Sequence, residues 1–142
     1  MGKRRRSREL AVQVLFQLGF IPGDPNNTFD LVCENFNSKK SVRPFSRQLV
    51  LGVCEKKNEL DSLISQTSKN WRLKRMTRTD KCILRLAVFE ILFMDDIPPK
   101  VSIDEAVEIG KKFGGEDSGS FINGVLDNIY NTLAKENQVN KP

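Results

Sequence analysis

The sequence predicts an all-α protein, because its apolar residues recur at helical spacing and nowhere alternate as they do in strands. Residues 77–94, TRTDKCILRLAVFEILFM, carry the main evidence: nearly every side chain from Cys82 to Phe93 is apolar. A helix that is apolar almost all round lies inside a protein core or a membrane. This stretch of twelve residues, interrupted by Arg85 and Glu90, is too short and too charged to cross a bilayer. We therefore expect one buried helix with the remaining helices packed around it.

Both ends of this central helix carry boundary signals. Thr77 and Asp80, three positions later, match a capping box, in which the hydroxyl accepts a free backbone N–H and the carboxylate meets the positive end of the helix dipole. Residues 95–99, DDIPP, end the helix, because proline cannot continue a helix and restricts the residue before it.

A basic run, KRRRSR at residues 3–8, opens the first predicted helix. Cations are unfavourable at the positive end of a helix dipole, so we expect a frayed helix end whose charges serve a bound anion. Arginine-rich segments that order on RNA are one such case, and a disordered tail that only aids solubility is the alternative. One apolar stripe predicts the helix itself, with Gly19 near its end: Leu10, Ala11, Val14, Leu15 and Leu18.

Two further helices are predicted in the first half of the chain. Residues 21–27, IPGDPNN, indicate a loop by their proline, glycine and asparagine content. Apolar residues at helical spacing then predict a short amphipathic helix over residues 28–36. A long helix follows from Pro44 to about Thr67, weakened at Gly52.

A basic linker at residues 68–76, SKNWRLKRM, contains the only tryptophan of the chain. We interpret Trp71 as a lid that packs the linker onto the core. A stacking platform is the alternative, because unpaired bases stack on aromatic rings in single-strand binding sites.

Two more helices are predicted after the central one. Ser102 and Glu105 match a second capping box, and the glycines of residues 113–115, FGG, end that helix. The last helix begins at residues 116–118, where Asp117 or Ser118 can be the cap, and its apolar stripe runs to Leu133.

A chain of 142 residues fits a single compact domain. We expect two small packed helical bundles with about seven helices, an N-terminal subdomain of about residues 1–76 and a C-terminal one of about 77–135. Residues 136–142 are predicted to be a loose tail. The sequence contains no secretory or transit signal and no run of membrane-spanning length, which favours a cytoplasmic protein.

The chain has no histidine and only three cysteines, Cys33, Cys54 and Cys82. The commonest general base and the commonest metal ligand are therefore missing, and zinc held by cysteine and histidine is excluded. The cysteines are far apart in the sequence, and each falls within a predicted helix, so we interpret them as small core residues in a reducing environment. We predict no metal and no cofactor.

Charge is distributed unevenly along the chain. Residues 1–81 carry 17 Lys/Arg and 8 Asp/Glu, a net charge of +9, whereas residues 82–127 carry 4 and 9, a net charge of −5. A basic first half favours a polyanionic partner, and an acidic second half could bind a basic one. An ordinary solvated surface is the alternative for each half.

No catalytic constellation is evident. The glycines near residues 114–119 lack the spacing of a phosphate-binding loop, and the acidic residues Glu116 and Asp117 would repel a phosphate. The acidic pairs at residues 95–96 and 104–105 lie at helix boundaries, where capping and solvation account for them. The sequence therefore predicts a binding protein and not an enzyme.

The order of these segments resembles the transcription antitermination factor NusB family. The similarity is carried by RRRSRELAVQVLF at the start, LVLGV at residues 49–53, and ILRLAVFEI, DIPPKVSIDEAVEIGKKFG and EDSGSFINGVLD between residues 83 and 127. It covers nearly the whole chain. A related domain is fused to ribosomal RNA cytosine methyltransferases, but the free factor is the better match.

The resemblance implies an all-helical, non-enzymatic RNA-binding adaptor. Members of the family recognise the single-stranded boxA element of ribosomal RNA leader transcripts, as a heterodimer with NusE, a protein of the small ribosomal subunit. The complex joins RNA polymerase and other Nus factors and permits read-through of termination signals. The sequence leaves open whether the free protein is a monomer or a homodimer.

The resemblance also implies which residues bind. Asp80 and Asp117 match acidic positions at or near the NusE side, which agrees with the acidic second half. The arginine-rich start, an aromatic position of the first helix and the aromatic–x–Asn of the last helix match RNA-contacting positions: Arg4, Arg5, Arg6, Arg8, Phe16, Phe121 and Asn123. Core packing is the alternative for the two phenylalanines, although both lie off or at the edge of their apolar stripes.

Two rival functions remain open. The chain could be a protein–protein module whose basic start serves only solubility, in which case it would show no preference among single strands. It could also be a regulatory domain of an RNA-modifying enzyme, which predicts a methyltransferase encoded next in frame.

Overall fold

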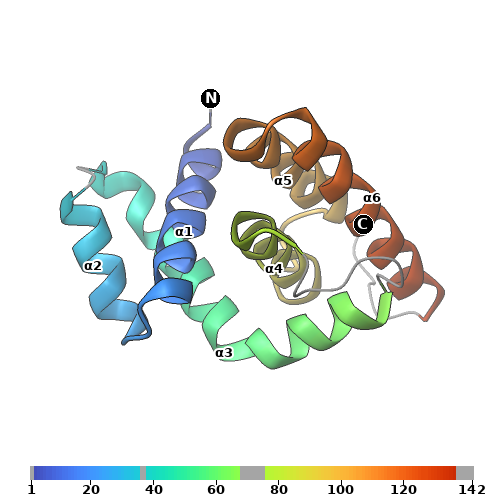
Figure 1. Ribbon diagram of the computed structural model, residues 1–142, viewed down its shortest axis with the longest axis horizontal. Helices are drawn as coiled ribbons and strands as arrows, with labels where there is room; N and C mark the ends of the chain where they lie inside the picture. Colours follow the sequence, from blue (N-terminus) through green and yellow to red (C-terminus); the bar gives the residue numbers. More distant parts are fainter. Residues whose placement is uncertain (1, 36–37, 68–75, 137–142) are drawn as a thin grey trace.

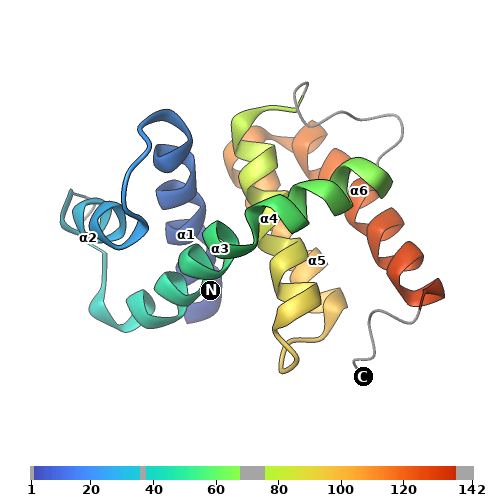
Figure 2. The ribbon, with the colours of Figure 1, turned by 90° about the horizontal axis from the view of Figure 1, so that it is seen from below.

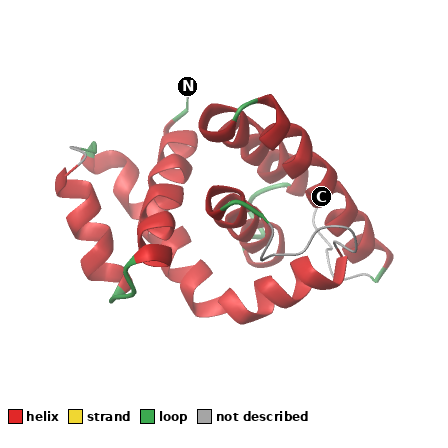
Figure 3. Cartoon of the chain, in the orientation of Figure 1, coloured by secondary structure: helices red, strands yellow, loops and turns green. Residues whose placement is uncertain are grey.

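Six α-helices and one short 3₁₀ helix make up the part of the chain that the structure, a computed structural model, describes: residues 2–35, 38–67 and 76–136 (Figures 1 and 3). No strand occurs in these ranges, so the predicted all-α class and helix number are confirmed. None of the described helices has the length and apolar content needed to cross a membrane. The helices are α1 (Lys3–Phe20), α2 (Pro25–Asn35), η1 (Lys40–Val42), α3 (Arg43–Thr67), α4 (Arg78–Phe93), α5 (Pro99–Gly114) and α6 (Glu116–Lys135).

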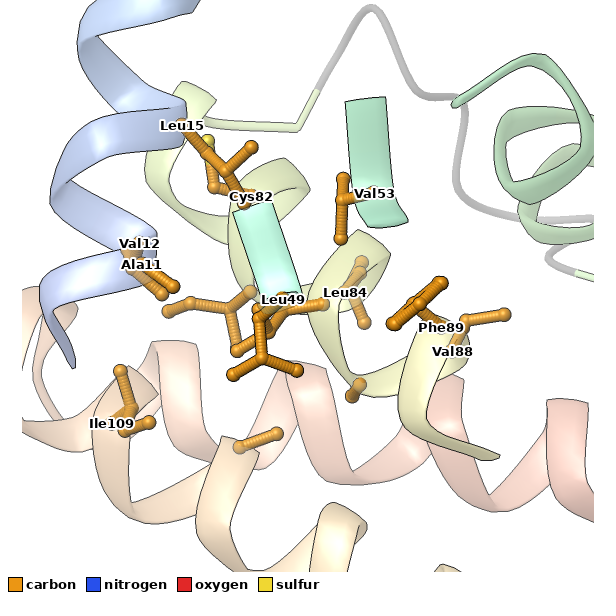
Figure 4. Close-up of a cluster of buried hydrophobic side chains, with 14 of the residues drawn as sticks. Ala11, Val12, Leu15, Leu49, Val53, Cys82, Leu84, Val88, Phe89 and Ile109 are labelled. Carbon is orange, nitrogen blue, oxygen red and sulfur yellow. The ribbon is translucent and has the colours of Figure 1, made fainter. Parts of the chain in front are cut away.

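Helix α4 is the axis of the fold, as its composition predicts. Ile83, Leu84 and Val88 are completely buried, and side chains from α1, α3, α4 and α5 gather in the cluster shown in Figure 4. Each such aliphatic side chain contributes roughly 1.5–3 kcal/mol through removal from water. The predicted cap is also present, because the Thr77 hydroxyl accepts the backbone N–H of Asp80 at 3.1 Å.

The cysteines lie in helices, as predicted. Cys33 and Cys82 are buried and Cys54 is half-buried, and all three are free thiols. Burial raises the pKa of the Cys82 thiol to about 11, so it stays protonated near neutral pH and behaves as a small apolar core residue.

Helix α3 crosses α4 at Gly52. A Cβ atom at this position would lie 2.1 Å from Cζ of Phe89, far inside van der Waals contact. The sequence predicts a weak point of the helix at Gly52, yet α3 continues through it without a break. The glycine is therefore explained by close packing, since only hydrogen leaves room for the ring of Phe89.

The first half of α3 packs against α1 and α2. Ser7 of α1 donates its hydroxyl to the carbonyl of Val42 at 2.8 Å, just before α3 begins. Arg47 forms an ion pair with Asp30 of α2 at 2.7 Å. These contacts attach the N-terminal helices to one end of α3.

From the crossing at Gly52 onward, α3 packs against α4 and α6. Asp61 accepts both Nε and Nη2 of Arg85 from α4, at 2.7 and 3.1 Å, and Asn128 of α6 donates its amide to the carbonyl of Thr67. Figure 2 shows α3 running from the side of α2 toward α6. The helix thus joins both groups of helices, and the predicted subdomain division near residue 76 stays a prediction.

Two helix starts differ from the prediction, and a proline explains each. Helix α2 begins at Pro25, three residues before the expected start, and α5 begins at Pro99 instead of Ser102. Proline suits the first turn because its missing N–H would have no partner there and its φ is already helical. Ser102 and Glu105 are thereby released from capping and pair with other residues. Trp71, the rest of the linker at 68–75 and residues 137–142 lie outside the described residues.

The junction of α5 and α6 is confirmed as a glycine turn. Gly115 has φ +87°, in the left-handed region that favours glycine, and its N–H bonds to the carbonyl of Lys111 at 3.0 Å. This turn sets the first turn of α6 beside the start of α4, where the Ser118 hydroxyl lies 3.5 Å from the Asp80 carboxylate.

Candidate functional site

The basic run at the start of the chain is helical from Lys3 onward, and it is not the frayed end that the sequence predicts. The reason is a set of acidic partners supplied by later helices. Arg5 and Arg8 lie one turn apart on the face of α1 that meets α5 and α4, because residues three apart share a helix face. Lys3 and Arg6 point to solvent.

Arg8 is part of the core, with only 3% of its surface exposed. Its Nε and Nη2 atoms each donate to a carboxylate oxygen of Glu90 at 2.8 Å, and its Nη1 lies 3.5 Å from Glu105. The Ser102 hydroxyl donates to the same Glu90 carboxylate at 2.9 Å. Arg8 was expected on an RNA-contacting surface, but these carboxylates and its burial keep its guanidinium away from a ligand.

Arg5 and Glu105 form a second, partly exposed pair. Two nearly parallel hydrogen bonds, of 2.9 and 2.6 Å, join the guanidinium to the carboxylate. The hydrogen bond from Arg5 holds the pKa of Glu105 below its ordinary value, and the same contact raises the pKa of Arg5. An arginine fork of this kind can exchange a carboxylate for a phosphate, since both accept two parallel N–H groups.

Three cations at this end of α1 remain accessible. Arg4 is exposed, and its guanidinium carbon lies 4.5 Å from the centre of the Phe45 ring. Its Nη2 forms a long ion pair of 3.4 Å with Oδ2 of Asp96. Lys3 and Arg6 are exposed, and within the described residues neither side chain forms an ion pair. Together, Lys3, Arg4 and Arg6 form the surface where a polyanion would compete least with the protein's own carboxylates for the cations.

Phe121 and Asn123 lie on α6, which packs against both α5 and α4. Phe121 is half-buried at the edge of the core, and Asn123 is exposed. Asn123 lines a hollow of about 480 Å³ together with Pro98, Lys100 and Tyr130. Asp96, the partner of Arg4, lies only two residues before Pro98, so the arginine end of α1 and this hollow border on the same α4–α5 turn.

A larger groove of about 860 Å³ lies at the opposite end of α1. Its apolar walls are the rings of Phe16, Phe20 and Phe113 with Val12 and Ile21, and Thr79 closes one side. Phe16 packs edge-on against Phe20 with ring centres 5.0 Å apart. The structure therefore separates Phe16 from the arginines with which the sequence grouped it.

Asp80 and Asp117 lie near this groove, because Asp80 follows the groove residue Thr79 and Asp117 precedes Ser118, whose hydroxyl lies 3.5 Å from the Asp80 carboxylate. Asp80 is only 6% exposed, and its Oδ1 has no hydrogen-bond partner among the described residues. Asp117 is exposed in the first turn of α6. A buried carboxylate oxygen without a partner costs free energy until a donor reaches it.

Sequence reasoning missed the residues that shape the groove. Phe20 and Ile21 are 60% and 65% exposed, and Phe113 is also exposed. A signal existed, because Phe20 and Ile21 follow Gly19 at the end of the first apolar stripe without belonging to it. Large apolar side chains that end a helix outside its stripe indicate a contact surface.

No group of three potential ligands for a metal ion occurs within the described ranges. The groove is lined mainly by aromatic and aliphatic side chains, and the surface at the other end of α1 carries cations and the amide of Asn123. Such surfaces are suited to binding polyanions and proteins.

Comparison with known proteins agrees with this arrangement. The profile of the NusB family matches residues 5–131. The chain is 47% identical over 141 residues to the transcription antitermination protein NusB of Desulfatibacillum aliphaticivorans, with 99% of both chains covered. The chain belongs to the NusB family.

Other relatives of this NusB-family chain are similar over comparable lengths. The NusB protein of Desulforapulum autotrophicum is 50% identical over 131 residues, covering 91% of this chain and 92% of the relative. The solved structure of T. maritima NusB has a TM-score of 0.82 at 37% identity, with 95% of each chain covered. A crystal structure of the antitermination factors NusB and NusE with double-stranded RNA has a TM-score of 0.83 at 30% identity, covering 93% and 98%.

Proposed function

We propose that this NusB-family protein is a non-enzymatic, cytoplasmic RNA-binding antitermination factor. It binds boxA single-stranded RNA of ribosomal RNA leader transcripts together with NusE and joins the RNA polymerase antitermination complex. The observation that carries the proposal is the similarity over nearly the whole chain to NusB proteins, including one solved with NusE and RNA. The accessible cations at the start of α1 and the apolar groove at its other end are separate surfaces, one for each proposed ligand.

The RNA surface is formed by the accessible cations Lys3, Arg4 and Arg6, with Arg5 able to exchange Glu105 for a phosphate. Cations that neutralise phosphates release counterions, so the affinity falls steeply with salt. We assign the binding of unpaired bases to Phe121 and Asn123, because stacking of a base on an aromatic ring contributes about 1–3 kcal/mol. Arg8 acts indirectly, by fixing α1 to α4.

The partner surface is the groove of Phe16, Phe20 and Phe113 with the neighbouring Asp80. Its occupant is NusE, a basic ribosomal protein, because apolar side chains can fill the groove while the negative charges of the buried Asp80 and the exposed Asp117 attract a basic partner. Phe16 is thereby assigned to the partner and no longer to RNA, because it lies among groove residues.

The test is a fluorescence anisotropy titration with a boxA-type single strand and a shuffled control, each with and without NusE and at several salt concentrations. We expect preference for boxA and tighter binding with NusE. Equal binding of both strands, unchanged by NusE, would show that the basic start acts only as a polycation. It would favour the rival function, a protein–protein module.

The Arg6→Gln variant tests, in the same titration, whether Arg6 contacts a phosphate of the RNA. We expect the logarithmic salt slope to become shallower by about 1, the loss of one released counterion. Lys57→Gln is the matched control, because it removes an equal charge from an exposed position of α3. An equal change in both variants would mean that only net charge matters.

A further inference from the structure

Arg78, the first residue of α4, lies across the end of α1. Its guanidinium carbon is 4.1 Å from the centre of the Phe20 ring, and its Nη1 donates to the carbonyl of Gly19 at 2.7 Å. Phe20 is 60% exposed and yet is one of the walls of the apolar groove. A ring this exposed would otherwise sample several rotamers.

Phe20 is held from two sides. Phe16 packs edge-on against it at 5.0 Å, while Arg78 covers its face. Gly19 permits this approach, since a Cβ atom there would lie 2.8 Å from the Arg78 Nη1. A planar guanidinium suits the position, because it can stack on a ring and donate to a carbonyl simultaneously.

The charge of Arg78 stabilises the C-terminal end of α1 and not the start of its own helix, α4. A positive charge is unfavourable in the first turn of α4, where Arg78 belongs. It is favourable at the C-terminal end of α1, where the carbonyl of Gly19 lacks an intrahelical partner. The contact with α1 therefore accounts for Arg78 better than the stability of α4 does.

We propose that Arg78 is a positioning residue for the groove: it fixes the Phe20 ring as the outer wall, so that the groove is formed before a partner arrives. The inference rests on the function proposed above, because that function supplies the protein partner that the groove binds. Arg78 acts on affinity through Phe20, by removing the cost of ordering an exposed ring at the interface.

The first experiment needs no partner. Aromatic NMR spectra of the free, full chain should show Phe20 resonances displaced by the ring of Phe16, and Arg78→Ala should move them toward averaged values. Arg78→Lys should keep part of the displacement, since an ammonium can still lie over the ring. Phe20 resonances that are the same in the wild type and in Arg78→Ala would overturn the proposal.

The second experiment is a double-mutant cycle on NusE binding, followed by surface plasmon resonance. We expect about fivefold weaker binding for Arg78→Ala, a larger loss for Phe20→Ala, and no additional loss in the double variant. If Arg78→Ala also costs fivefold in the Phe20→Ala background, Arg78 contacts the partner directly and the positioning role is refuted.

Gly19→Ala provides a variant with opposite effects on stability and binding. Alanine should maintain or raise the stability of α1, because it is a better helix former than glycine. Its methyl group displaces the guanidinium, so binding should weaken about as much as in Arg78→Ala. If wild-type protein fails to bind NusE, the proposed function fails, whereas the spectra of the free protein still decide the role of Arg78.

Discussion

Arg8 and Glu90 show how one arginine of a basic run becomes part of the core. Their side chains are 4% and 1% exposed, and both carboxylate oxygens are engaged. A buried ion pair adds little net stability compared with an apolar pair, but removing one partner leaves a costly unpaired charge. The pair therefore specifies how α1 meets α4.

Arg8→Ala should lower the free energy of unfolding by about 3–5 kcal/mol, because Glu90 would remain buried without its counter-charge. Urea unfolding followed by circular dichroism measures the loss. Arg6→Ala is the control, since it deletes an exposed arginine of the same helix and should change stability by less than about 0.5 kcal/mol. A loss as small for Arg8 as for Arg6 would contradict the buried pair.

Glu105 gives the same junction a pH dependence. Arg5 keeps the pKa of Glu105 below the ordinary value of 4.5 in the folded protein. The pair therefore contributes its full stability above the pKa of the unfolded chain, and this contribution is lost as the pH falls through the folded pKa. The pair is partly exposed, so solvent screening keeps the contribution small.

Arg5→Gln should therefore reduce the acid-induced loss of stability. We expect the urea midpoints of variant and wild type to converge as the pH is lowered from 6 to 3, with the difference smaller at high salt. Midpoints that stay parallel over this range would show that Glu105 is not stabilised by Arg5.

At the scale of elements, the crossing of α3 and α4 depends on a single missing methyl group. Gly52 in a helix interior would ordinarily be improved by alanine, by about 1 kcal/mol. Here the added Cβ would lie 2.1 Å from Phe89, and overpacking of a core typically costs 1–3 kcal/mol. Packing outweighs propensity at this position.

Gly52→Ala should therefore destabilise the protein by up to about 2 kcal/mol, the overpacking cost less the gain in helix propensity, in a thermal unfolding measurement. The same substitution in a Phe89→Leu background should be neutral or stabilising, because leucine lacks the ring atoms that the methyl group meets. Destabilisation of equal size in both backgrounds would place the cause in the helix backbone and not in the crossing.

The helices could be predicted from the sequence, because each is defined by local signals. The apolar stripe of α4 and the cap at Thr77 lie within one short stretch. The directions of the arginines could not be predicted, because Glu90 and Glu105 lie 82 and 100 positions after Arg8 and Arg5. The groove was missed for the same reason, since its walls come from three helices whose relative placement no local pattern records.

At the scale of the whole molecule, α3 makes the two groups of helices interdependent. Its start is attached to α1 and α2, and the part from Gly52 onward to α4 and α6. Loss of either group would expose apolar residues of the same helix. We therefore expect one cooperative unfolding transition even though two subdomains are predicted.

Cys33 and Cys82 can test this, because one lies in α2, the other in α4, and both are 2% exposed. Pulsed thiol labelling across a urea series should give the same midpoint for both cysteines. Labelling of Cys33 at lower urea than Cys82 would reveal N-terminal helices that unfold independently.

The helical start of α1 has a thermodynamic consequence for RNA binding. Because the segment is already helical and ion pairs with α5 and α4 hold Arg5 and Arg8 in place, it has little disorder to lose in binding RNA at the surface proposed above. Binding that folds a segment carries a large negative heat-capacity change. A calorimeter should therefore record only the modest heat-capacity change of covering a preformed surface, with association limited by encounter and not by folding.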